Sequence, residues 1–171
     1  MVRIVTIIAL FVFTNVLSQT NFPDGWIGKW KGNLEIMAPD GTVKQTYLMQ
    51  INISKLPEPK KWQWQIIYGD KDIRNYEIIE KDAAKGHYVL DEKNNILIDV
   101  TVFGNITFSN FEVQGTRIFD THRLIYNTIV FELNTSKVAE ENSSGNGTKE
   151  IPTVKSLPQT GYQKAVLVKQ N

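Results

Sequence analysis

Most of the chain alternates between apolar and polar residues with a period of two, which is typical of β-strands with one buried and one exposed face. Residues 42–53 and 62–68 show the pattern most clearly, since every second residue in them is large and apolar or aromatic over most of the stretch. Long stretches with the 3.6-residue period of an amphipathic helix are missing. The pattern predicts an all-β fold.

Short turns rich in Gly, Asn and Asp separate the alternating stretches. A turn is expected at Asp120-Thr121, and a bulge at Gly115 within one strand. Nine strands are predicted, at residues 25–36, 42–53, 62–68, 73–80, 86–91, 96–103, 106–119, 122–133 and 162–169.

Short connections between successive strands favour an antiparallel meander, folded as either a sandwich or a closed barrel. Closure removes the exposed edges that a soluble sheet would otherwise carry. We therefore expect an antiparallel up-and-down β-barrel of about 8–10 strands, in which residues 162–169 close on residues 25–36. A barrel of this size has a lumen large enough for one small ligand.

Two segments differ from this pattern. Residues 1–18 combine Arg3 with an apolar run and small residues before Ser18, which predicts a signal peptide. A transmembrane helix is the alternative, but the apolar run is shorter than the ~20 residues that a span needs. Residues 135–161 are polar and rich in Gly, Ser and Asn, which predicts a mobile loop. Residues 19–171 are expected to form a single β-barrel domain that contains this loop.

Charge and cysteine content limit which partners and which chemistry the protein can have. Removing residues 1–18 takes Arg3 from 19 Lys+Arg and leaves 18, against 18 Asp+Glu. A net charge near zero argues against nucleic acid or an anionic membrane as the main partner. The 171 residues include no cysteine, which excludes disulfides and thiol chemistry.

A secreted domain without disulfides favours a bacterial setting, either secreted or periplasmic. Asn-x-Ser/Thr sequences would instead suggest a eukaryotic glycoprotein, unless an Asn-rich chain produces them by chance. Both interpretations stay open. These sequences begin at Asn52, Asn105, Asn134, Asn142 and Asn146.

Catalytic and metal-binding patterns are weak. His87 and His122 are the only histidines, and neither has an acidic residue at metal-ligand spacing. Asp91 and Asp99 could act as an acid and a base across a hairpin, but carboxylates near turns are usually solvated. We therefore expect no metal site, no cofactor and no catalytic residue.

Candidate ligand contacts come from aromatic and soft side chains, which either line a pocket or fill a core. Arg74 and Tyr76 share one strand face and could hold a ligand carboxylate. The alternative is an outward Arg74 whose stem covers a neighbouring aromatic ring. The candidate ligand-binding residues are Tyr47, Met49, Trp62, Trp64, Tyr68, Arg74, Tyr76, Phe108 and Tyr126.

Gly28-Lys29-Trp30, preceded by Asn21-Phe22 and Asp24, resembles the Gly-x-Trp signature of the lipocalins and the wider calycin group. The resemblance implies that Trp30 plugs one end of the barrel and packs on a basic residue near the last strand, Lys164 or Lys169. Gly28, Trp30 and Lys169 are the expected structural residues. The chain departs from the family because it has no Thr-Asp-Tyr motif, no disulfide and no long helix before the last strand.

Together these features predict a secreted or periplasmic lipocalin-like protein that binds a small hydrophobic or amphipathic ligand in its barrel and catalyses nothing. The first alternative is an envelope or protein-interaction module with a solid barrel, which contacts a protein through its rim or residues 135–161. The second is a lipocalin-like enzyme. Neither nucleic acid nor a transmembrane segment is expected.

Overall fold

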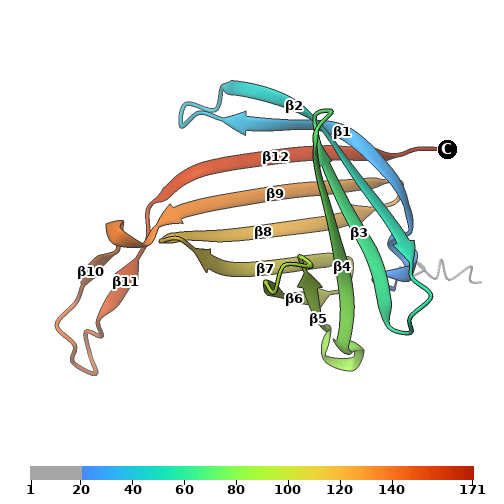
Figure 1. The fold of residues 1–171 in the computed structure, drawn as a ribbon. Helices are drawn as coiled ribbons and strands as arrows, with labels where there is room; N and C mark the ends of the chain where they lie inside the picture. Colours follow the sequence, from blue (N-terminus) through green and yellow to red (C-terminus); the bar gives the residue numbers. More distant parts are fainter. Residues whose placement is uncertain (1–20) are drawn as a thin grey trace, which may run out of the picture.

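The computed structural model describes residues 21–171, so the predicted signal peptide at 1–18 lies outside the described residues. Ten strands form a closed antiparallel barrel in the order β1-β12-β9-β8-β7-β6-β5-β4-β3-β2, and two more form a separate hairpin, β10-β11 (Figure 1). The predicted all-β up-and-down barrel is confirmed. Among residues 21–171, no helix is long and apolar enough to cross a membrane.

The barrel strands are β1 (Gly28–Met37), β2 (Val43–Lys55), β3 (Lys61–Tyr68), β4 (Asp72–Asp82), β5 (His87–Asp91), β6 (Leu97–Phe103), β7 (Ile106–Val113), β8 (Thr116–Ile125), β9 (Thr128–Lys137) and β12 (Gln159–Lys169). The hairpin strands are β10 (Asn142–Ser144) and β11 (Val154–Ser156). Three single-turn 3₁₀ helices are η1 (Asp24–Trp26), η2 (Ala83–Lys85) and η3 (Val138–Glu140).

Closure occurs where β1 pairs with β2 on one side and with β12 on the other, as the sequence predicts. Trp30 lies opposite Ile51 in one ladder and opposite Lys169 in the other. Gly32 is required in this strand, because a Cβ there would collide with the backbone carbonyl of Val166. The absent side chain allows β1 and β12 to approach closely.

Two turns correct the predicted strand boundaries. Gly115 is not a bulge: Gln114 and Gly115 both have positive φ and form the two-residue turn between β7 and β8. Consequently Asp120-Thr121, predicted as a turn, lies in the middle of β8.

The predicted strand at 122–133 is interrupted at Tyr126-Asn127, where Tyr126 adopts a positive φ. These changes turn nine expected strands into ten. The first strand begins at Gly28, after η1, rather than at residue 25.

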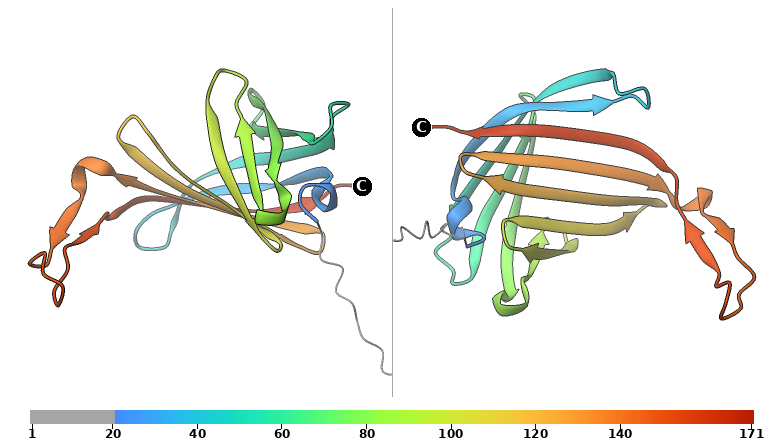
Figure 2. Two further views of the ribbon diagram at one scale, coloured as in Figure 1. Left: turned by 90° about the horizontal axis from the view of Figure 1, so that it is seen from below. Right: turned by 180° about the vertical axis from the view of Figure 1, so that it is seen from behind.

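The segment predicted as an irregular loop, 135–161, is partly regular. The barrel strands extend into it from both sides, to Lys137 in β9 and from Gln159 in β12. Between them the β10-β11 hairpin projects beyond one end of the barrel (Figures 1 and 2), and Lys155 Nζ lies 2.8 Å from Glu141 Oε1 across its base. The period of two does not predict this hairpin, because all of its strand residues are exposed and neither face of it is buried.

An aromatic plug fills the opposite end, where η1 lies. Trp26 and Trp30 are fully buried, and Trp30 Nε1 donates a 2.9 Å hydrogen bond to the carbonyl of Trp26. The Phe22 ring packs edge-on against Trp26 and Tyr88, at centroid distances of 5.2 and 5.0 Å. We call this the closed end. The strand ends beside Tyr68 and the start of β8 form the other, open end.

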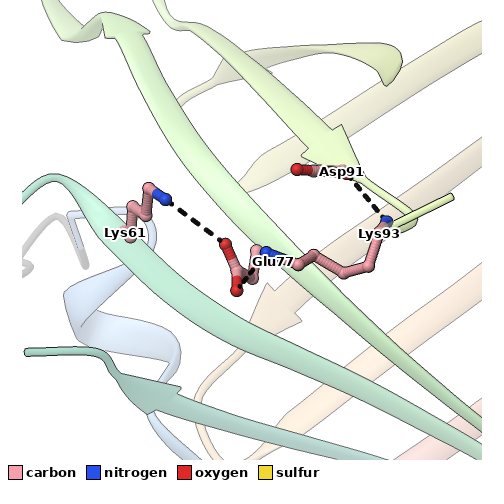
Figure 3. A network of polar contacts seen from close by, with 4 residues as sticks. All are labelled: Lys61, Glu77, Asp91 and Lys93. Carbon is pink, nitrogen blue, oxygen red and sulfur yellow. Dashed lines mark hydrogen bonds and ion pairs between the residues drawn. The ribbon is translucent and has the colours of Figure 1, made fainter. Parts of the chain in front are cut away.

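A polar network on the outer face ties three strands together. Glu77 of β4 lies between two lysines, with Lys61 Nζ 3.6 Å from its Oε2 and Lys93 Nζ 2.9 Å from its Oε1 (Figure 3). The backbone N–H of Lys93 also donates to the Asp91 carboxylate at 2.7 Å. This network is structural, because Glu77 faces away from the residues that fill the barrel.

Candidate ligand site in the barrel lumen

A cavity of about 120 Å³ lies inside the barrel between the closed and open ends. Buried rings of Phe22, Trp64 and Phe131 form its inner part. The partly exposed side chains of Tyr68 and Arg74 mark its outer edge. Its wall comes from seven consecutive strands, β3 to β9, so the cavity belongs to one side of the lumen.

The ladder between β6 and β7 is short beside the cavity. These strands pair only at Thr101–Phe103 with Ile106–Phe108, whereas β7 and β8 pair along the whole of β7. Toward the open end, the β5-β6 and β7-β8 hairpins diverge (Figure 2). Val100 of β6 and Ser109 of β7 both border the cavity in this region.

Four polar side chains from β7 and β8 face the cavity together. Thr107 lies opposite His122 in the ladder, and Ser109 lies opposite Asp120, so the register places all four on the inner face. His122 Nδ1 is 3.5 Å from both Asp120 Oδ1 and Thr107 Oγ1. The side chains of His122 and Asp120 are only 9% and 15% exposed. We call these four residues the lumen polar cluster.

Burial favours the uncharged forms of both titratable residues in the lumen polar cluster. Loss of water raises the pKa of Asp120 to about 7 and lowers the pKa of His122 to about 3. The His122 ring packs between Trp64 and Phe131, at centroid distances of 5.4 and 4.8 Å. Its Nε2 is buried and has no hydrogen-bond partner among the described residues, which costs free energy unless a ligand supplies a partner.

Arg74 faces the outer edge of the cavity but is already engaged. Its guanidinium donates to both oxygens of Asp72, at 3.2 and 3.0 Å, and lies 4.9 Å from the centroid of the Tyr68 ring. The bond to Asp72 raises the pKa of Arg74, and burial raises that of Tyr68 to about 12. Arg74 thus borders the cavity and also covers an aromatic ring, while a bond from Arg74 to a ligand carboxylate stays a prediction.

Four of the predicted ligand contacts line the cavity together: Trp64, Tyr68, Arg74 and Tyr76.

Met49 is fully buried in the core and does not line the cavity. Trp62 is buried at the closed end, where its Nε1 donates to Asp24 Oδ1 at 2.7 Å. A groove of about 670 Å³ opens at this end beside Asn21, and none of the lumen polar cluster lines it.

The remaining three predicted contacts do not line this cavity. Tyr47 is exposed near the open-end part of β2. Phe108 packs near Phe103 and Phe119, at centroid distances of 5.8 and 6.2 Å, because its strand position alternates with the inward Thr107 and Ser109. Tyr126 is 87% exposed in the β8-β9 turn.

The residues expected to form the base of the barrel lie together at the closed end. Lys169 Nζ lies over the Trp30 ring, 5.1 Å from its centroid. A Cβ on Gly28 would lie 2.6 Å from Lys169 Cε, so glycine leaves space for this lysine. The other lysine considered, Lys164, lies instead 3.4 Å from Glu35.

The carboxylates considered for catalysis lie apart from the cavity. Asp99 contacts the exposed His87 at 2.9 Å, and Asp91 accepts a backbone hydrogen bond in a turn. Within residues 21–171, no group of three or more His, Asp or Glu side chains is arranged to hold a metal ion. The lumen polar cluster is therefore the main candidate site.

The fold and the cavity define a small closed antiparallel β-barrel, plugged at one end, with a polar group inside its lumen. No protein-family model matches the sequence, and no curated protein matches it. The barrel is similar to the crystal structure of a protein of unknown function from the DUF3598 family of Nostoc punctiforme, with a TM-score of 0.60. The two sequences are 9% identical over 84% of this chain and 47% of the other, so this chain spans about half the length of that protein. The similarity concerns the fold alone.

Proposed function

We propose that this protein is a lipocalin-like barrel that binds a small amphipathic molecule in its lumen and does not catalyse a reaction. The observation that carries the proposal is the lumen polar cluster, which lies inside an otherwise largely apolar cavity. Buried polar groups are costly without hydrogen-bond partners. A ligand with one polar group and a compact apolar body would satisfy both parts of the wall.

The cavity volume limits the size of the ligand. A dry apolar cavity of about 150 Å³ takes up benzene, so a cavity of about 120 Å³ suits a molecule of comparable size. A long acyl chain would have to extend out past Tyr68 and Arg74. Small aromatic or branched aliphatic compounds are therefore better probes than fatty acids.

The base of the barrel supports a relationship to the lipocalins and the wider calycin group. Trp30 fills the closed end and carries Lys169 from the last strand over its ring, with Gly28 leaving space for that lysine. This is the arrangement that the Gly-x-Trp resemblance implies. A signal peptide at residues 1–18 and the absence of cysteine would fit a secreted or periplasmic setting, which is part of the proposal.

One observation favours a second function, that of a protein-interaction module. Phe103, Phe108 and Phe119 form an aromatic group on the outer face of β6 to β8, and Phe103 is 67% exposed. Exposed aromatic groups of this kind occur at protein interfaces. The experiment below separates the two functions, because only lumen binding depends on the size of inward side chains.

The test uses a matched pair of variants of adjacent residues. Ser109 faces the cavity and Asn110 is exposed on the outer face of the same strand. Ser109→Leu should fill the cavity, whereas Asn110→Leu adds the same side chain outside it. Benzyl alcohol binding is measured by isothermal titration calorimetry, and native mass spectrometry detects any co-purified molecule.

We expect the unchanged protein and Asn110→Leu to bind benzyl alcohol with similar affinity, and Ser109→Leu to lose binding. Circular dichroism and urea unfolding check that both variants are folded. Equal binding by Ser109→Leu would place the site outside the lumen. No binding of any small probe by the unchanged protein would favour the interaction module.

A further inference from the structure

We infer that the lumen ligand is a small primary amine, bound as its ammonium ion with Asp120 as the counter-ion. This inference rests on the proposed function and names the chemical class of its ligand. It follows from the balance of charge around the cavity, from the aromatic wall and from the number of hydrogen-bond acceptors.

The charges that face the cavity leave a carboxylate without a cationic partner. Asp120 and Glu92 are the acidic side chains in the wall, and Arg74 is its basic side chain. Arg74 is already held by both oxygens of Asp72. Among residues 21–171, no Lys or Arg nitrogen lies within 4.0 Å of the Asp120 carboxylate, whose only ion-pair contact is the neighbouring His122. The buried Asp120 carboxylate therefore has no Lys or Arg partner, and a cationic ligand would provide one.

Aromatic side chains also line the cavity near Asp120. Trp64 and Phe131 contact the His122 ring beside Asp120, and Tyr68 borders the outer part of the cavity. Aromatic faces attract ammonium groups most strongly where water is excluded. Arg74 already shows such a contact with Tyr68. The wall thus suits a cation and its apolar substituent.

The hydrogen-bond inventory matches an ammonium group, which has three donors and no acceptor. When Asp120 is ionised, His122 can donate its Nδ1–H toward that carboxylate, and Nε2 is then a buried acceptor without a protein partner. The Asp120 carboxylate and the Ser109 hydroxyl are further acceptors at the cavity. An incoming carboxylate would instead meet Asp120 and Glu92, with Arg74 already occupied.

The proposal has a defined pH dependence. Burial holds the pKa of Asp120 at about 7, so the counter-ion is protonated in more acidic solution. Amine affinity should rise about tenfold per pH unit below that pKa and then level off. The titratable and charged groups around the cavity are Asp120, His122, Tyr68, Tyr76, Arg74 and Glu92. Burial lowers the pKa of His122 to about 3 and raises the pKa values of both tyrosines, so none of these three titrates near pH 7.

The experiment compares three probes of one shape: benzylamine, benzyl alcohol and benzoate. Calorimetry at pH 8 compares the unchanged protein, Asp120→Asn and the control Asp99→Asn. The control removes an exposed carboxylate that does not line the cavity. A charge-assisted hydrogen bond corresponds to a preference of about ten- to hundredfold. We expect benzylamine to bind at least about tenfold more tightly than benzyl alcohol, and benzoate to bind weakest.

Asp120→Asn should abolish the preference for benzylamine and leave benzyl alcohol affinity within about threefold, because Asn keeps the shape of Asp but not its charge. Asp99→Asn should behave as the unchanged protein. Equal or tighter binding of benzyl alcohol or benzoate, or a preference that survives Asp120→Asn, would overturn the amine while leaving lumen binding intact. Failure of all three probes to bind would overturn lumen binding itself.

A second measurement needs no variant. For the unchanged protein at pH 7, titrations in buffers of different ionisation enthalpy should show that benzylamine binding releases protons, because the ligand favours ionised Asp120. Benzyl alcohol should release none. Proton uptake with benzylamine, or affinity that is constant between pH 5.5 and pH 8, would contradict the inference.

Discussion

Replacing Asp120 with Asn should stabilise the empty barrel, and by an amount that depends on pH. The folded protein holds the pKa of this carboxyl at about 7, against 3.8 for an ordinary aspartate, because burial penalises its charge. One pH unit of difference corresponds to about 1.36 kcal/mol. The difference of about three pH units therefore sets an upper limit of about 4 kcal/mol on the cost of ionising buried Asp120.

The free energy of unfolding falls with rising pH, because the folded protein binds the Asp120 proton more tightly than the unfolded chain does. Below pH 3.8 the carboxyl is protonated in both the folded and the unfolded protein, so it carries no penalty. As pH rises from 3.8 to about 7, the unfolded chain ionises first and the folded protein loses stability. Above pH 7 the penalty is constant. Asn has no charge to bury, so Asp120→Asn avoids this loss.

The assay is urea unfolding followed by tryptophan fluorescence at pH 4, 5, 6, 7 and 8. We expect Asp120→Asn to exceed the unchanged protein by up to about 4 kcal/mol at pH 8 and by almost nothing at pH 4. Protonation of His122, whose pKa is lowered by burial, destabilises both proteins in acid and cancels in the comparison. Asp99→Asn is the exposed control. An equal difference at every pH, or a less stable Asp120→Asn at pH 8, would refute the assignment of a buried and unpaired carboxyl.

Two further predictions concern the contact between the first and last strands. Lys169→Met should lower the free energy of unfolding by about 0.5–1 kcal/mol, because it keeps the apolar stem but removes the charge above Trp30; no loss in urea unfolding would show that this contact is not stabilising. Gly32→Ala should cost about 1–3 kcal/mol, because its Cβ collides with the Val166 carbonyl and must displace a strand. An unchanged unfolding midpoint for Gly32→Ala would contradict the close approach of β1 and β12.

The sequence was sufficient to predict the barrel because alternation and turn residues act locally. The period of two located most strands, and Gly-containing turns such as Gly104-Asn105 marked their ends. The turn at Tyr126-Asn127 was missed because it contains no glycine and both flanking segments continue the alternation. The sequence also predicts that the last strand closes the barrel, because each edge strand of the meander needs a hydrogen-bonded partner.

The site was harder to predict because β7 reverses the usual relation between polarity and burial. In β7, Thr107 and Ser109 face inward while Phe108 lies on the outer face. Alternation identifies which residues share a face, but polarity then selects the wrong face as the buried one. The sequence predicts a turn at Asp120, whereas Asp120 lies in β8 on the same face as His122. One feature of the sequence does indicate the site: Asp120 and His122 share one face of residues 116–125 with the apolar Leu124.

The most direct test of lumen binding is an isotope-filtered nuclear Overhauser measurement on the protein with bound benzylamine. Lumen binding predicts contacts from the aromatic protons of benzylamine to the rings of Trp64 and Phe131, which line the cavity. Contacts to Phe103 and Phe119 on the outer face, without any to the lumen rings, would contradict it.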